Sequence, residues 1–78
     1  MMTEEMAGTY SKWAVPSLQT IRWSKVLTQS DLAKRSGVSR TTIVRLENGE
    51  KAQAGTIRKL AKALSVSVDA LLQEPEIG

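Results

Sequence analysis

Two glycines bound a short helical stretch in the middle of the chain, and their spacing constrains the fold more than any other feature. Gly37 and Gly49 can both take the left-handed conformation that ends a helix, at little steric cost. Ser39, which follows the first glycine closely, has the side chain of a helix N-cap. The sequence therefore predicts two short helices joined by a tight turn, the second over about residues 39–48.

The remaining segments carry further helix signals. Pro16 suits the first turn of a helix, and Ser67 is a candidate N-cap near the end of the chain. Thr28 and Asp31 resemble a capping box. The apolar residues of a fourth helix recur three and four positions apart, at Ile57, Leu60, Ala61 and Leu64. Since we find no alternating pattern typical of strands, we expect an all-α fold of five helices.

The chain has 78 residues, which is enough for one small domain around one core. Aromatic residues make up only 4% of it, so the core must be built from aliphatic side chains. Residues 1–13 show no sustained apolar period, and we expect them to form a flexible N-terminal arm. We place the folded domain at residues 14–74 and a C-terminal tail at residues 75–78.

The composition excludes several classes of function. Cysteine and histidine are both absent from the sequence, so the usual zinc and haem ligands and the usual general base are missing. We expect no metal, no cofactor and no enzymatic activity. The apolar runs are too short to span a membrane, and the start MMTEEM lacks the features of a signal peptide. The sequence therefore predicts a cytoplasmic protein.

Charge is distributed unevenly along the chain. All 11 lysines and arginines lie between Lys12 and Lys62, and only Asp31, Glu47 and Glu50 accompany them as acids. The other five acids lie toward the two ends. A basic centre of this kind suits a polyanionic partner, although the solvated surface of a helical protein gives a similar pattern.

The predicted helix over residues 39–48 has two distinct sides. At about 100° per residue, Ile43 and Leu46 fall together and mark the side that faces the core. The opposite side is narrow and polar, and a helix has the right width for the major groove of DNA. Arginine can bond guanine, threonine can bond a base edge, and valine can contact a thymine methyl group. We therefore expect base contacts from Arg40, Thr41, Val44 and Arg45, with Asn48 on the same side.

The stretches LTQSDLAKRSGVSRTTIVRLENG and TIRKLAKALSVSVDALL resemble the phage-repressor and Cro-like helix-turn-helix family, often called the XRE family. The resemblance covers roughly residues 16–73. Ala33 is small where the two helices of the motif cross, and Gly37 makes the turn between them. The resemblance implies a five-helix DNA-binding domain that binds double-stranded operator DNA as a homodimer, with its third helix in the major groove.

The resemblance also implies roles outside that groove. Arg22 and Glu47 match a pair that forms an internal salt bridge in some relatives. Val26 and Ser65 stand where relatives place glycine, and such side chains tolerate a positive φ less well. Contacts with the DNA backbone are expected from Thr28, Gln29, Ser39, Asn48, Lys51 and Gln53.

Two functions follow from these patterns. The first is a sequence-specific DNA-binding transcriptional regulator that acts as a repressor by occupying an operator. The alternative is a protein-interaction module, such as the antitoxin of a toxin–antitoxin pair, which also represses its own operon. In that case the acidic arm from Met1 to Lys12 would bind the toxin. Deleting the arm would separate the two, because only the alternative needs it for its main task.

Overall fold

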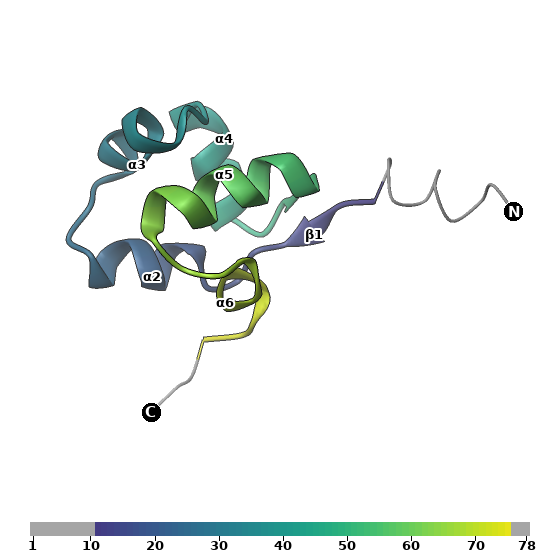
Figure 1. Ribbon diagram of the computed structural model, residues 1–78. Helices are drawn as coiled ribbons and strands as arrows, with labels where there is room; N and C mark the ends of the chain where they lie inside the picture. The colour runs from purple at the N-terminus through teal and green to yellow at the C-terminus, as the bar shows by residue number, and fades with distance from the viewer. Residues whose placement is uncertain (1–10, 76–78) are drawn as a thin grey trace, which may run out of the picture.

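Five helices and one pair of short strands make up residues 11–75, which are the residues that this computed structural model describes. In chain order they are β1 (Trp13–Ala14), α2 (Leu18–Ser24), α3 (Gln29–Ser36), α4 (Arg40–Glu47), β2 (Lys51–Ala52), α5 (Ala54–Leu64) and α6 (Val68–Leu72). Figure 1 shows α3 and α4 together on one side, α5 across the middle, and α2 and α6 on the opposite side. The five predicted helices are confirmed. Within residues 11–75, every helix is too short or too polar to cross a membrane.

Side-chain caps determine where three of the helices begin. Thr28 Oγ1 accepts from Asp31 N–H and Asp31 Oδ2 accepts from Thr28 N–H, both at 3.0 Å, which forms the capping box before α3. Ser39 caps α4 by accepting from the backbone N–H of Thr42 at 3.2 Å. Ser67 caps α6 in the same way. The helix starts predicted at these residues are confirmed.

Each helix contributes at least one fully buried aliphatic side chain to a single core. α3 packs against α4 and α5, while α2 packs on α4 and α6 on α5. The fully buried side chains are Leu18, Leu32, Ile43, Ile57, Leu60, Leu64 and Leu71. Burying each of them contributes about 1.5–3 kcal/mol, so the aliphatic stripes hold the helices together. The predicted apolar stripe of α5 is confirmed, since Ala61 is buried as well.

A two-stranded antiparallel sheet, which the sequence did not predict, joins distant parts of the chain. Trp13 pairs with Ala52, and Ala14 pairs with Lys51. Ala52 lies in the segment between two of the predicted helices, and it is buried in the core. Trp13, which we expected at the end of the arm, lies in β1. The rest of the expected arm, except for residues 11 and 12, lies outside the described residues, as do residues 76–78 of the expected tail.

A buried ion pair joins α2 to the end of α4. Arg22 Nε donates to Glu47 Oε2 at 2.6 Å and Nη2 donates to Oε1 at 2.9 Å, while Nη1 donates to the carbonyl of Leu27 at 2.7 Å. The two side chains are only 7% and 3% exposed. Gln29 Nε2 on α3 donates to Glu47 Oε1 at 3.0 Å, and Gln19 Nε2 lies 3.4 Å from the same oxygen. One carboxylate therefore holds three helices together.

These contacts keep both members of the pair charged. Burial alone would raise the pKa of Glu47, but hydrogen bonds from Arg22 and Gln29 and the positive charge of the guanidinium lower that pKa below its ordinary value. The hydrogen bond to Glu47 raises the pKa of Arg22. Within the described residues, every buried polar side-chain atom has a hydrogen-bond partner. The pair is therefore fully compensated, and removing either partner leaves a buried charge alone.

Two residues other than glycine have a left-handed backbone conformation, which usually requires glycine. Val26 has φ 57° and Ser65 has φ 59°. After α2, the N–H of Val26 donates to the carbonyl of Trp23 at 2.9 Å, and the N–H of Leu27 donates to that of Arg22 at 3.2 Å. These two bonds form a Schellman closure, in which the left-handed residue satisfies carbonyls at the helix end. The turn after α2 therefore has the geometry of a glycine turn, although valine stands at the position where relatives place glycine.

Packing does little to offset the strain at Val26, because this residue is 89% exposed. The next residue, Leu27, is buried, and its carbonyl accepts from Arg22 Nη1. The chain on both sides of Val26 is therefore anchored, and the turn is forced on the valine by its neighbours. A left-handed conformation costs an L-residue about 1–2 kcal/mol, and more for a β-branched one.

We predict that Val26→Gly raises the free energy of unfolding by about 1 kcal/mol, because relief of the strain exceeds the entropy that glycine adds to the unfolded chain. Urea denaturation of the purified protein measures this value. Val26→Ala serves as the matched control and should recover only part of the gain, since it keeps Cβ. A glycine variant less stable than the parent would show that the turn stores no strain.

The pH dependence of stability tests the buried ion pair. Glu47 has a lowered pKa in the folded protein, so its contribution is present above the ordinary carboxyl pKa of about 4 and is lost as the pH falls through the folded value. At pH 7, we expect Glu47→Gln to lower the free energy of unfolding by about 3 kcal/mol.

The difference between the parent and Glu47→Gln should shrink as the pH falls below about 4, because the parent carboxyl is then also neutral. Denaturation curves recorded from pH 7 to pH 3 measure this difference. Glu50→Gln, at an exposed position, is the control and should change stability by less than about 0.5 kcal/mol. A difference for Glu47→Gln that stays constant with pH would contradict the account.

Candidate nucleic-acid interface

The outward side of α4 is polar and open to solvent. Ile43 and Leu46 are 0% and 4% exposed and point into the core, as the helical pattern predicted. The four expected base-contacting residues lie together on the other side of the helix. Of these, Val44 is half-buried, and the exposed ones are Arg40, Thr41 and Arg45.

The orientation of α4 is fixed at both of its ends. At its start, Gly37 has φ 77° and its N–H donates to the carbonyl of Ala33 at 2.9 Å, which closes α3 and turns the chain toward α4. Val38, in this turn, is buried in the core. At its end, Glu47 is held by Arg22 from α2. The polar side of α4 is therefore presented on a rigid support.

The hydroxyl groups expected at the DNA backbone already serve the helix starts. Hydrogen bonds from the backbone and side chain of Thr28 lower the pKa of Asp31, which stabilises the charged capping box. Thr28 Oγ1 accepts from the Asp31 N–H in this box, and the Thr28 side chain also hydrogen-bonds the Asp31 carboxylate. Ser39 Oγ donates to Thr42 Oγ1 at 2.9 Å, so its proton is in use. Both hydroxyl groups are therefore engaged as caps at the starts of α3 and α4.

Gln29 lies at the first position of α3, but its side chain points inward. The residue is half-buried, and its amide nitrogen donates to Glu47 Oε1. This bond uses one of the two amide protons, so the side chain is part of the network around the buried ion pair. No sequence pattern predicts this contact, because it depends on how α3 and α4 pack.

The segment after α4 carries exposed polar side chains past the end of the helix. Gly49 has φ 103°, and its N–H and that of Glu50 close α4 by donating to the carbonyls of Leu46 and Arg45. The expected backbone-contacting residues of this segment are all exposed, and they are Asn48, Lys51 and Gln53. They follow directly from the polar side of α4, so the two groups form one continuous surface.

The structure adds a basic residue that we did not expect in this region. Lys12, immediately before β1, lines a hollow together with Arg45 and Lys51. Lys12 lies about 40 residues before this loop in the sequence, and only the pairing of β1 with β2 brings it close. A strand of two residues is too short to show alternation, so no sequence signal predicts the contact.

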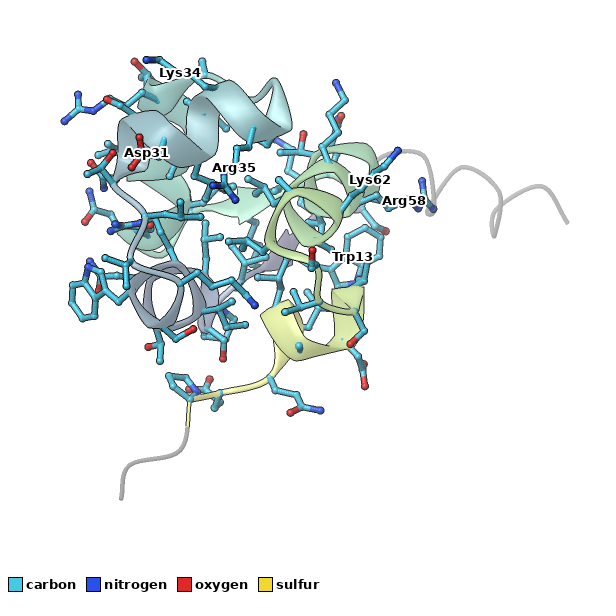
Figure 2. All side chains as sticks on the ribbon, turned by 60° about the vertical axis from the view of Figure 1, so that its left-hand side comes forward. Trp13, Asp31, Lys34, Arg35, Arg58 and Lys62 are labelled. Atoms are coloured by element: carbon cyan, nitrogen blue, oxygen red, sulfur yellow. The ribbon has the colours of Figure 1, made fainter. Side chains whose placement is uncertain are left out.

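A second basic region occupies a different side of the molecule. Figure 2 shows Lys34 and Arg35 on α3 and Arg58 and Lys62 on α5. All four residues are exposed. α4 and α5 bury their apolar stripes in the same core, so their outward sides point in different directions. We call this region the α3–α5 surface.

Comparisons with known proteins agree with this geometry. The helix-turn-helix family model HTH_3 matches residues 18–71. The HTH-type transcriptional repressor RghR of Bacillus subtilis (strain 168) is 40% identical over 57 residues, which are 70% of this chain and 42% of that repressor. The chain thus spans less than half the length of this relative. A crystal structure titled hypothetical transcription factor NHTF from Neisseria matches with a TM-score of 0.70 and 31% identity, over 80% of this chain and 73% of that one.

The family match covers α3, the glycine turn and α4, and it extends over the helices that support them. Both similar proteins are named for a role in transcription. The chain belongs to the helix-turn-helix family, as an XRE-type DNA-binding domain of transcriptional regulators.

Proposed function

We propose that this chain binds an operator in a sequence-specific manner and acts as a repressor. The observation that carries the proposal is the exposed polar side of α4, which is held rigidly at both of its ends. The similarity to RghR, whose name describes a transcriptional repressor, supports the direction of regulation. Occupation of the operator would block access of RNA polymerase to the promoter.

In this proposal α4 lies in the major groove, which is about 12 Å wide and admits one helix. Arg40 and Arg45 bond guanine O6 and N7, because a guanidinium matches these two acceptors. Thr41 bonds a base edge, and Val44 contacts a thymine methyl group. Base-edge contacts of this kind distinguish the four base pairs, so they supply the specificity.

Backbone contacts fix the register of α4 along the groove. Thr28 and the first turn of α3 approach one phosphate, where the positive end of the helix dipole favours the anion. The segment after α4 approaches the other side of the groove. The residues assigned to the backbone are Thr28, Gln29, Ser39, Asn48, Lys51 and Gln53. Gln29 also holds Glu47, so it connects this contact to the buried ion pair.

A homodimer with two-fold symmetry would place two copies of α4 on half-sites about 34 Å apart, which is one turn of B-form DNA. The operator would then be close to palindromic. Binding should weaken steeply as the salt concentration rises. Protein binding releases counterions from the DNA phosphates, and this release is less favourable when the surrounding solution already contains more salt.

The alternative function, an antitoxin that binds its toxin through the acidic arm, depends on residues that are mostly outside the described ones. The exposed side of α4 serves DNA binding in both cases. The geometry of the described residues therefore bears on operator binding.

We expect Arg45→Ala to weaken binding to a preferred duplex by about 1–3 kcal/mol and to relax the preference at one base pair, because one bidentate base contact is lost. Lys51→Ala should instead weaken binding to all duplexes alike and lower the salt slope by about 1. Fluorescence anisotropy with a preferred duplex and a scrambled duplex of equal length measures both effects.

Circular dichroism provides the control, since both residues are exposed and their replacement should leave the helical signal unchanged. Equal losses on the two duplexes for Arg45→Ala would mean that this residue reads no base. An unchanged salt slope for Lys51→Ala would remove it from the backbone contacts.

A further inference from the structure

A polar hollow lies where α4, β2 and the start of α5 meet. Its walls carry three cationic side chains, from Lys12, Arg45 and Lys51, and the carboxylate of Glu50. Buried Leu46 and Ala52 lie beneath them and belong to the core, so the base of the hollow is rigid. Three cations facing one carboxylate leave the hollow positive, which suits a small anion.

The strand pair holds Lys12 in this place through backbone contacts. Trp13 is opposite Ala52, so the antiparallel register brings Lys12 next to Gln53 at the entry to α5. The side chain of Lys12 is exposed and is free to reach a ligand above the hollow. Its backbone position depends on the pairing of β1 with β2, and β2 ends at Ala52, which is buried in the core.

The hollow borders the side of α4 that we assign to the major groove. Arg45 belongs to both, since it is exposed on that side and also lines the hollow. A base pair contacted by Arg45 has its own phosphates a short distance away along the groove edge. The hollow therefore lies where the DNA backbone would pass.

The chemistry of the walls matches a phosphodiester. Ammonium and guanidinium groups donate charge-assisted hydrogen bonds to phosphate oxygens. Thr42 and Thr56 add hydroxyl groups to the lining, and Thr42 Oγ1 accepts from Ser39, which leaves its own proton for a phosphate oxygen. We infer that this hollow binds one phosphate of the operator backbone and that Lys12 is one of its ligands, an assignment that rests on the proposed operator binding.

Glu50 is expected to affect DNA affinity in the opposite direction to the three cations. Its carboxylate lies in the lining and repels a bound phosphate, so it weakens the site that the cations create. Removing a cation and removing this acid should therefore change the affinity in opposite directions. A structural role of these exposed side chains in folding would predict no such opposition.

The α3–α5 surface offers a matched control. Lys62 is an exposed lysine like Lys12, but it lies in the last turn of α5 and lines a separate hollow with Arg35. Figure 2 shows both side chains on the α3–α5 surface. Replacing Lys62 removes the same charge from the protein without touching the hollow beside α4.

The experiment measures affinity for a preferred duplex from about 0.05 to 0.3 M salt with four proteins: the parent, Lys12→Gln, Glu50→Gln and Lys62→Gln. Lys12→Gln should weaken binding about fivefold at 0.15 M salt and lower the salt slope by about 0.9, because one phosphate contact is lost. It should do so equally on a scrambled duplex, since a phosphate carries no sequence information. Glu50→Gln should tighten binding, and Lys62→Gln should stay within about twofold of the parent.

An effect of Lys12→Gln no larger than that of Lys62→Gln would overturn the inference, because it would reflect only the general charge of the protein. Looser binding by Glu50→Gln would also overturn it. If Lys12→Gln is without effect while Arg45→Ala still loses its base preference, the hollow is unused and operator binding stands. If the parent binds no duplex more tightly than a scrambled one, the proposed function itself has failed.

Discussion

The buried ion pair between Arg22 and Glu47 is the contact on which the arrangement of the binding surface depends. A charge with 3% of its side chain exposed is tolerated only when it is paired and fully hydrogen-bonded. Glu47 meets this requirement by accepting from α2 and α3 while it sits at the last position of α4. The direction of α4 is therefore tied to two other helices at the C-terminal end of α4.

The same pair explains how a strained turn survives. Arg22 Nη1 bonds the carbonyl of Leu27, and buried Leu27 anchors the chain just after Val26. With α2 fixed on one side and Leu27 on the other, the residue between them must take a left-handed conformation whatever its side chain. The backbone strain at Val26 thus results from the packing of α2 and α3 around the carboxylate of Glu47.

The strand pair holds the loop after α4 in place, as the ion pair holds α4 itself. β1 attaches the chain before α2 to the loop between α4 and α5, and Ala52 anchors that loop in the core. Lys12 and Lys51 are thereby held beside Arg45. The surface that we assign to DNA combines α4, the loop between α4 and α5, and the residue before β1. Because the strand pair and the core hold these segments in place, the surface has a fixed geometry before DNA binds.

Much of the fold follows from local chemistry that can be read in the sequence. Thr28, Ser39 and Ser67 begin helices because their side chains satisfy free backbone N–H groups, and Gly37 ends one because a positive φ is easy for glycine. These effects involve residues close in sequence, so the pattern predicts them.

Contacts between distant residues were less accessible to such prediction. The strands were not predicted, because a strand of two residues shows no periodicity. Without the strand pair, the position of Lys12 beside the loop after α4 could not be predicted either. The inward turn of Gln29 depends on the packing of α3 against α4, which no local pattern reports. The outward side of α4 was predictable, since helical spacing alone separates it from Ile43 and Leu46.

Sequence-specific binding by α4 can be measured by selection from a pool of randomised duplexes at about 0.15 M salt, because specific and non-specific binding separate under these conditions. We expect enrichment of a defined site with two-fold symmetric halves about one helical turn apart. A pool that remains random after repeated selection would contradict it.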